Sequence, residues 1–146
     1  MYYGELCPPW SNLSVRLFCP VISKRLLDSS TDEDALRCTL IRAICELCPS
    51  GTAADCVAQW LDNSLYIGKD VRTAIRVLGS IGNETAIACL KKHLSLGFEG
   101  GEATGEKYLR SLATALASNG FTDDEIRRIA GSNEMHLGRR SADGTY

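Results

Sequence analysis

The residues whose types and spacing best suit chemistry are two cysteines, Cys45 and Cys48, in the segment CELCP. A Cys-x-x-Cys pair can bind zinc or an iron–sulfur cluster, and it can exchange disulfides when one thiol has a lowered pKa. A structural zinc site usually adds a second such pair or two histidines, whereas His93 and His136 stand far apart. Cys38, Cys45 and Cys48 instead follow helical spacing, and a free cysteine packs like a small apolar residue. We expect them to fill a core and to bind no metal or cofactor.

Cys89 and His93 are a second candidate, because residues four apart share one face of a helix. A catalytic dyad also needs a group that orients the histidine, and the sequence indicates none beside it. The glycines of residues 97–105 lack the Lys-Ser/Thr pair of a phosphate-binding loop. The sequence therefore predicts no catalytic residue and no enzymatic activity.

The acidic residues between Asp28 and Asp34 form a third cluster. A calcium-binding loop of this kind would need a glycine at its turn, and this segment has none. Carboxylates are favourable at the positive end of a helix dipole, and serine and threonine are preferred caps. We expect Ser30 or Thr31 to cap a helix that begins here.

Cysteine usage and the N-terminal segment predict where the chain works. It has seven cysteines, an odd number. The segment MYYGELCPPW has no early lysine or arginine, unlike a secretory signal, and no run approaches the roughly 18 apolar residues that span a bilayer. We expect free thiols in a reducing compartment, a cytoplasmic location and no membrane partner.

Composition and charge favour a helical globular protein. Hydrophobic residues make up 45% of the chain and aromatic residues only 7%, which favours helices over a β-sandwich. The net charge of −2 gives no electrostatic reason to expect nucleic acid, since binding a duplex requires a basic surface.

Residues 69–96 predict a pair of helices. Apolar residues recur at helical spacing in both, and Gly82 followed by Asn83 is typical of the left-handed cap that separates two helices. The apolar residues are Val71, Ala74, Ile75, Leu78 and Ile81 in the first helix and Ile87, Leu90 and Leu94 in the second.

Related patterns lie on both sides of this pair. About 34 residues earlier, Ile41 aligns with Ile75, and about 38 residues later, Arg110 aligns with Arg72. The last helix of the later copy begins at Thr122, where Glu125 completes a capping box. Helix pairs repeated at this period indicate a solenoid.

The run VRTAIRVLGSIGNETAIACLKKHL resembles a HEAT-like repeat of the bacterial type. The residues that match the family pattern are Val71, Arg72, Ala74, Leu78, Gly79, Ile81, Gly82, Ala86 and Leu90. The resemblance implies an all-α fold, a short right-handed α-solenoid of about three HEAT-like helix pairs with an N-terminal helical cap. It implies no particular function.

The expected boundaries follow from these patterns. Residues 1–137 form one domain, made of an N-terminal cap at 1–29 and helix pairs at 30–63, 69–96 and 106–131. The glycine-rich residues 97–105 are predicted to be a loop, and residues 138–146 a flexible tail that is mobile unless it docks.

A repeat surface without catalytic residues predicts a protein-binding module. We expect the second helix of each pair to line a concave face that grips a partner protein such as a toxin or effector. The chain would then act as an adaptor, or as an inhibitor of the immunity-protein kind. The polar residues expected on this face are Asp55, Gln59, Asp62, Glu84, Lys91, Lys92, Arg127 and Arg128.

Two alternatives stay open. A basic stripe could contact phosphates, as HEAT-like DNA glycosylases do with their concave face. Its residues are Lys69, Arg72 and Arg76, with Lys91 and Lys92. The chain could instead be an accessory protein that handles a cofactor, as the HEAT-like phycobilin lyases do, although it shows no motif for this beyond the repeats.

Overall fold

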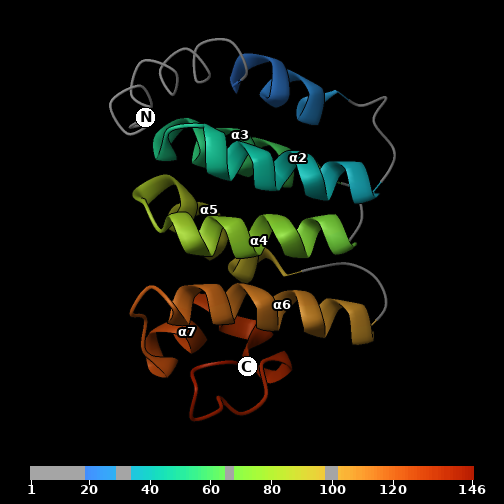
Figure 1. Ribbon diagram of the computed structural model, residues 1–146. Helices are drawn as coiled ribbons and strands as arrows, with labels where there is room; N and C mark the ends of the chain where they lie inside the picture. The colour runs from blue at the N-terminus through green and yellow to red at the C-terminus, as the bar shows by residue number, and fades with distance from the viewer. Residues whose placement is uncertain (1–18, 29–33, 65–67, 98–101) are drawn as a thin grey trace.

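The computed structural model describes residues 19–28, 34–64, 68–97 and 102–146. Every regular element within these ranges is a helix, which confirms the all-α prediction (Figure 1). The elements are a helix over residues 19–27, α2 (Asp34–Leu47), α3 (Ser50–Asp62), α4 (Lys69–Ile81), α5 (Glu84–Leu96), α6 (Glu102–Ala117), α7 (Asp123–Ala130) and the 3-10 helix η1 (Gly131–His136). None of these described helices has the length and apolar character that crossing a bilayer requires.

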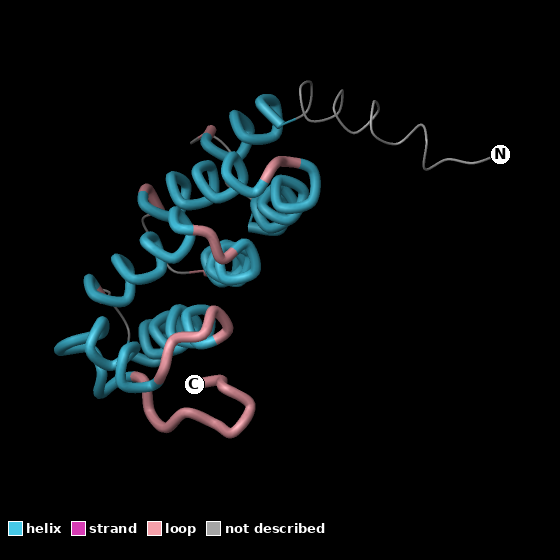
Figure 2. Tube along the Cα trace, turned by 90° about the vertical axis from the view of Figure 1, so that its left-hand side faces the viewer, coloured by secondary structure: helices cyan, strands magenta, loops and turns pink. Residues whose placement is uncertain are grey.

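The helices pack in two layers. Helices α2, α4 and α6 lie side by side in that order, and α3, α5 and α7 lie side by side behind them (Figures 1 and 2). Each helix of the first layer also contacts the helix that follows it in the chain. The 3-10 helix η1 closes the C-terminal end, where it packs against α5, α6 and α7.

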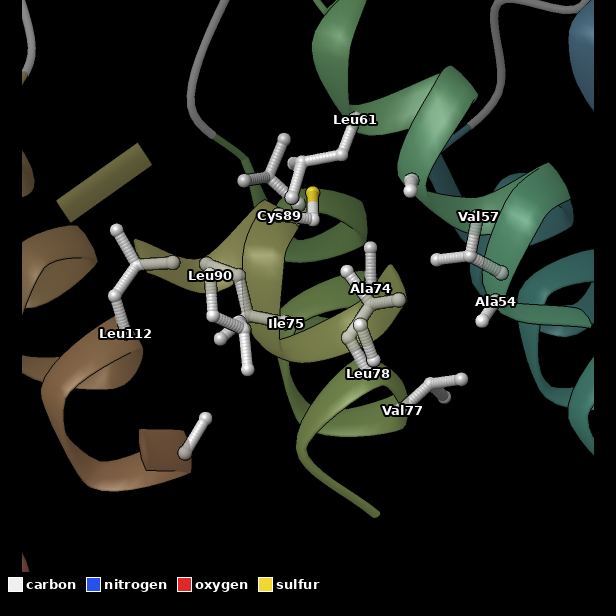
Figure 3. Close-up of a cluster of buried hydrophobic side chains, with 14 of the residues drawn as sticks. Ala54, Val57, Leu61, Ala74, Ile75, Val77, Leu78, Cys89, Leu90 and Leu112 are labelled. Atoms are coloured by element: carbon white, nitrogen blue, oxygen red, sulfur yellow. The ribbon is translucent and has the colours of Figure 1, made fainter. Parts of the chain in front are cut away.

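The core lies between the layers and is built from the apolar stripes that the sequence predicts. Ala74, Ile75 and Leu78 of α4 are buried against Leu90 of α5 and Leu112 of α6 (Figure 3). Ile81, at the end of the α4 stripe, is only partly buried. Residues at i, i+3, i+4 and i+7 share one helix face, so a single stripe is sufficient to attach each helix to its neighbours.

The predicted helix ends are confirmed. Gly82 adopts the left-handed conformation with φ of 64°, and its N–H donates to the Leu78 carbonyl at 3.0 Å. The Asn83 side chain accepts from the Ala86 N–H at 2.9 Å and so caps α5. Thr122 and Glu125 form the complete capping box of α7. Such caps satisfy backbone groups that have no partner inside the helix.

Helices α4 and α6 approach each other closely at Gly79. A Cβ atom on Gly79 would lie 2.9 Å from the Cβ of Ala115, so only glycine allows this contact. The Asn119 amide, just past the end of α6, donates to the Gly79 carbonyl at 2.9 Å and to the Ala115 carbonyl at 2.8 Å. These contacts join α4 and α6 at their C-terminal ends.

The start of α6 differs from the prediction. It begins at Glu102, inside the segment 97–105 that was expected to be a loop, and it continues through Gly105. A glycine inside a helix costs only about 1 kcal/mol relative to alanine, and the buried residues that follow it, Tyr108 and Leu109, offset that cost. Residues 98–101 lie outside the described ranges, as do Ser30 and Thr31, the expected caps of α2.

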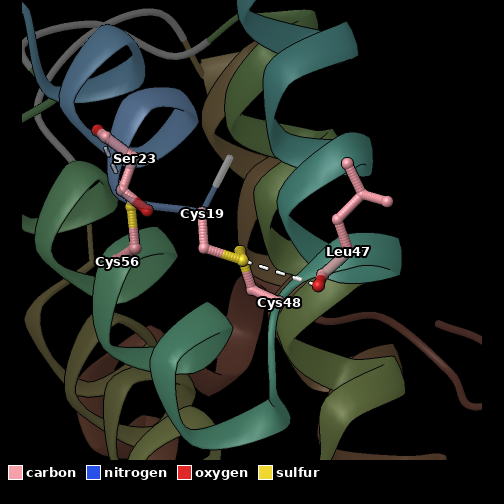
Figure 4. The surroundings of a disulfide bond; sticks show 5 residues. All are labelled: Cys19, Ser23, Leu47, Cys48 and Cys56. Atoms are coloured by element: carbon pink, nitrogen blue, oxygen red, sulfur yellow. Dashed lines mark hydrogen bonds between the residues drawn. A yellow bond between two sulfur atoms is a disulfide. The ribbon is translucent and has the colours of Figure 1, made fainter. Parts of the chain in front are cut away.

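The cysteines also differ from the prediction that all thiols are free. Cys19 and Cys48 form a disulfide, with their Cα atoms 5.6 Å apart, that ties the helix over residues 19–27 to the end of α2 (Figure 4). The odd cysteine count could not reveal this pairing, because it depends on how that helix packs. Among the described residues, Cys38, Cys45, Cys56 and Cys89 remain free. Cys48 therefore pairs across the fold and not with its Cys-x-x-Cys neighbour Cys45.

Candidate functional site

A groove of about 660 Å³ lies between α4 and α6 on the outer side of the first layer. Most of the side chains that line it are cationic or carry a hydroxyl group. Its floor is formed by Ile75, Ala115 and Gly79. The charged and hydroxyl-bearing residues that line it are Arg72, Arg76, Ser80, Lys107, Arg110, Ser111, Thr114, Ser118 and Tyr146.

Helical spacing brings these polar residues to one place. Arg72 and Arg76 are one turn apart on α4, on the side that faces away from the core. On α6, Lys107, Ser111 and Thr114 follow the same face in successive turns. Residues three or four apart lie above one another on a helix, so two parallel polar stripes border the groove.

The charged side chains of the groove have one sign. Four of its lining side chains are cationic, those of Arg72, Arg76, Lys107 and Arg110, and no aspartate or glutamate lines it. Arg110 is partly neutralised, because its guanidinium lies 3.5 Å from Glu106 and donates to the His136 carbonyl at 3.2 Å. The other three cations form no ion pair with any carboxylate of the described residues. The groove is therefore suited to an anionic ligand.

The C-terminal segment contributes one residue, Tyr146, to the lining of the groove. The predicted tail, residues 138–146, has no helix but docks on α6 and α7. The Tyr146 N–H donates to the Thr114 hydroxyl at 3.1 Å, the Tyr146 hydroxyl donates to Asp123, and Arg140 lies 5.9 Å from the centre of the Tyr146 ring. Burial and the bond to Asp123 raise the pKa of Tyr146 to about 12.

The eight residues predicted to bind a partner lie on the other layer. They sit on α3, α5 and α7, and none of them lines the groove. Lys92 forms an ion pair with Asp62 at 3.2 Å, Lys91 lies 4.9 Å from the centre of the Phe121 ring, and Arg127 pairs with Asp123 at 2.9 Å. The remaining four, Asp55, Gln59, Glu84 and Arg128, are exposed on the same layer.

The alternative basic stripe is split by the structure. Arg72 and Arg76 line the groove, Lys69 lies exposed at the start of α4, and Lys91 and Lys92 belong to the other layer. Lys107 and Arg110 were not predicted as site residues. The signal for Arg110 was present, because the repeat alignment sets it against Arg72.

A second group of polar residues surrounds His93 on α5. Its Nε2 lies 2.7 Å from a carboxylate oxygen of Asp62 at the end of α3, and its Nδ1 lies 3.0 Å from the Tyr108 hydroxyl of α6. The expectation that no group orients this histidine is wrong, because Asp62 and Tyr108 both do. They come from neighbouring helices, so spacing within one helix could not reveal them.

Cys89 lies one helical turn before His93 and is buried. Burial, and secondarily the charge of Asp62, raise the pKa of this thiol to about 12. A thiol with so high a pKa holds almost no thiolate at neutral pH, and the thiolate is the nucleophile. Cys89 and His93 therefore do not form an activated nucleophile pair in this arrangement.

Comparison with known protein families, with curated proteins and with solved structures finds no match to this chain.

Proposed function

We propose that the protein is a non-catalytic helical-repeat module that binds an acidic segment of a partner protein in the groove between α4 and α6. The observation that carries the proposal is the charge of the side chains in that groove, with four cations and no aspartate or glutamate among its lining residues. In this proposal the helices form a short right-handed α-solenoid of three HEAT-like pairs. The contacts of α4 with α2 and α6, and of α5 with α3 and α7, support that arrangement.

The shape and chemistry of the groove favour an extended peptide. Its polar edges offer guanidinium groups, which bind carboxylates with two parallel hydrogen bonds, and a row of hydroxyls that can bond a peptide backbone. Its floor of Ile75, Gly79 and Ala115 is apolar and can accept a small aliphatic side chain. Acidic residues interleaved with small apolar ones would satisfy both surfaces.

A protein partner fits the groove better than a nucleic acid does. Binding of single strands relies on aromatic side chains that stack on bases, and the groove contains one ring, that of Tyr146. The net charge of the chain is −2, which opposes non-specific binding to a long polyanion. A local basic groove on a weakly acidic protein instead selects a short acidic segment. An inhibitor or adaptor role, as in immunity proteins, is consistent with a binding site that holds no activated nucleophile.

Fluorescence anisotropy tests the proposal. The full chain is titrated into a labelled peptide rich in glutamate, aspartate and small aliphatic residues, with a lysine-rich peptide and a single-stranded oligonucleotide as competitors. We expect the acidic peptide to bind. The double variant Arg72→Glu, Lys107→Glu should weaken this binding at least about tenfold, because two favourable charges are lost from a hydrogen-bonded site. Lys91→Glu with Lys92→Glu is the matched control, since it makes the same charge change on the other layer.

Three outcomes would overturn the proposal. Tighter binding of the oligonucleotide, with a steep loss of affinity as salt rises, would assign the groove to nucleic acid. A larger effect of the control pair than of the groove pair would move the binding surface to the layer of α3, α5 and α7. Absence of binding to the acidic peptide at high micromolar concentration would remove the groove as a binding site.

A further inference from the structure

Three different metal-binding side chains converge at the junction of α3 and α5. A carboxylate oxygen of Asp62, the sulfur of Cys89 and a ring nitrogen of His93 all lie within 4.8 Å of one another. Cys89 and His93 are one turn apart on α5, and Asp62 is the last residue of α3, which packs beside α5. Two adjacent helices of the same layer thus supply the three groups.

We propose that Asp62, Cys89 and His93 form a binding site for a divalent transition-metal ion, with zinc as the best fit. This site lies apart from the groove and is independent of the proposed function. Sulfur, imidazole nitrogen and carboxylate oxygen together form a ligand set that zinc accepts, at distances of about 2.3, 2.0 and 2.0–2.2 Å respectively. Around a tetrahedral ion those ligand atoms lie about 3.3–3.8 Å apart, so on binding the 2.7 Å between Asp62 and His93 Nε2 has to widen, and any wider separation, at most 4.8 Å, has to shorten.

The hydrogen bonds of His93 favour this role. A metal-bound histidine usually donates its other ring N–H to a nearby acceptor, which fixes the orientation of the ring. Nε2 faces Asp62, and Nδ1 faces the Tyr108 hydroxyl at 3.0 Å. The ion would replace the proton between Nε2 and Asp62, and Nδ1 would then donate to Tyr108. A tyrosine hydroxyl can accept as well as donate, so Tyr108 serves both states.

The charges balance when an ion binds. Asp62 contributes one negative charge, and Cys89 contributes another once its thiol proton is released to solvent, so two ligands neutralise a divalent ion. His93 would bind the ion as the neutral imidazole, with its ring proton on Nδ1. Lys92, which pairs with Asp62 at 3.2 Å, must move aside, and its side chain is 54% exposed and therefore free to do so. With three protein ligands, the fourth position is left to water.

Cobalt substitution tests the site. The full chain, kept anaerobic so that Cys89 stays reduced, is titrated with Co²⁺ and then with Zn²⁺ as competitor. We expect one equivalent of cobalt to bind, with a near-ultraviolet thiolate-to-cobalt band that zinc abolishes. Cys89→Ser should remove the band, and Asp62→Asn and His93→Gln should each weaken binding more than tenfold. Tyr108→Phe should weaken it about tenfold to a hundredfold through the orienting bond alone.

The matched control is Cys45→Ser, which removes a free cysteine outside the cluster. Circular dichroism of every variant confirms that the helices remain formed. A thiolate band that persists in Cys89→Ser, or that is lost equally in Cys45→Ser, would overturn the proposal. A wild-type chain that binds no cobalt or zinc at micromolar concentration would show that the cluster is only a set of hydrogen bonds. Neither result depends on whether the groove binds a peptide.

Discussion

The guanidinium of Arg37 on α2 lies 2.6 Å from the carboxylate of Asp70 on α4, and the two side chains are 6% and 1% exposed. Asp70 also accepts a hydrogen bond from the N–H of Val71 at 2.9 Å, in the first turn of α4. The pair thus links two neighbouring helices of the first layer at a buried position. Removing one member of a buried ion pair leaves the other charge uncompensated, and this costs much more than the pair itself contributes.

We therefore expect Arg37→Met to lower the free energy of unfolding by about 3–5 kcal/mol. Adding Asp70→Asn should restore more than half of this loss, because asparagine carries no charge and can still accept from the Val71 N–H. Urea unfolding followed by circular dichroism measures both variants. A double variant no more stable than Arg37→Met alone would contradict the charge argument.

Gly79→Ala should destabilise the fold although it adds a better helix former. The new Cβ would lie 2.9 Å from the Cβ of Ala115 and 3.3 Å from its Cα, so α4 and α6 would have to separate. Overpacking costs about 1–3 kcal/mol and helix propensity returns about 1 kcal/mol, which leaves a net loss of up to about 2 kcal/mol.

Two further variants isolate the contact at Gly79. Gly51→Ala on α3 is the control, because a Cβ there meets nothing within 4 Å, and it should be neutral or slightly stabilising. Ala115→Gly should relieve the clash when it is combined with Gly79→Ala. Equal unfolding midpoints for Gly79→Ala and Gly51→Ala would show that the two helices are not held at this distance.

Reduction of the Cys19–Cys48 disulfide should lower the free energy of unfolding by about 2–4 kcal/mol, as expected when a cross-link no longer restricts the unfolded chain. The bond spans a sequence separation of 29 residues. Thiol titration in denaturant, before and after reduction, should register two additional thiols per chain. An unchanged thiol count would contradict the pairing, and Cys45→Ser should leave the increase intact.

The docking of Tyr146 should be visible in an alkaline titration. Its pKa is raised to about 12 by burial and by the bond to Asp123, whereas an unperturbed tyrosine has a pKa of about 10. The folded state thus favours the protonated phenol, so the contribution of Tyr146 to stability is complete below about pH 10 and is lost as pH rises toward 12.

Tyrosinate absorbance measures this titration, and Tyr146→Phe identifies the signal by difference. Asp123→Asn should bring the pKa of Tyr146 back toward about 10, because it removes the negative charge beside the phenol. A difference spectrum that titrates near pH 10 in the wild type would show that the C-terminal segment is not held against Asp123.

Local patterns in the sequence were sufficient to predict the helices but not the sites. The stripe through Ala74 and Leu78 predicted α4, and Gly82 and Thr122 predicted helix ends, because these signals depend on residues within one or two turns. The start of α6 was not predicted, because the free energy gained by packing its later turns exceeds the local cost of placing Gly105 in a helix.

The unpredicted contacts all join different helices. Cys19 meets Cys48, Arg37 meets Asp70, and Asp62 meets His93 only after the layers form. Each partner is polar or small, and neither its spacing nor its type indicates which residue on another helix it will contact. The repeat alignment came nearest to such a prediction when it placed Arg110 opposite Arg72, since it is the one pattern that relates separate helices.

The bonds of Asn119 have a mechanical consequence for the groove. Because its amide donates to the carbonyls of both Gly79 and Ala115, and because Gly79 has no side chain that would keep the two helices apart, we expect this end of the groove to stay fixed. We expect any widening of the groove to tilt α6 away from α4 about that end, so that the far end, beside Arg72 and Lys107, moves most. A bulky ligand would then enter beside those two cations.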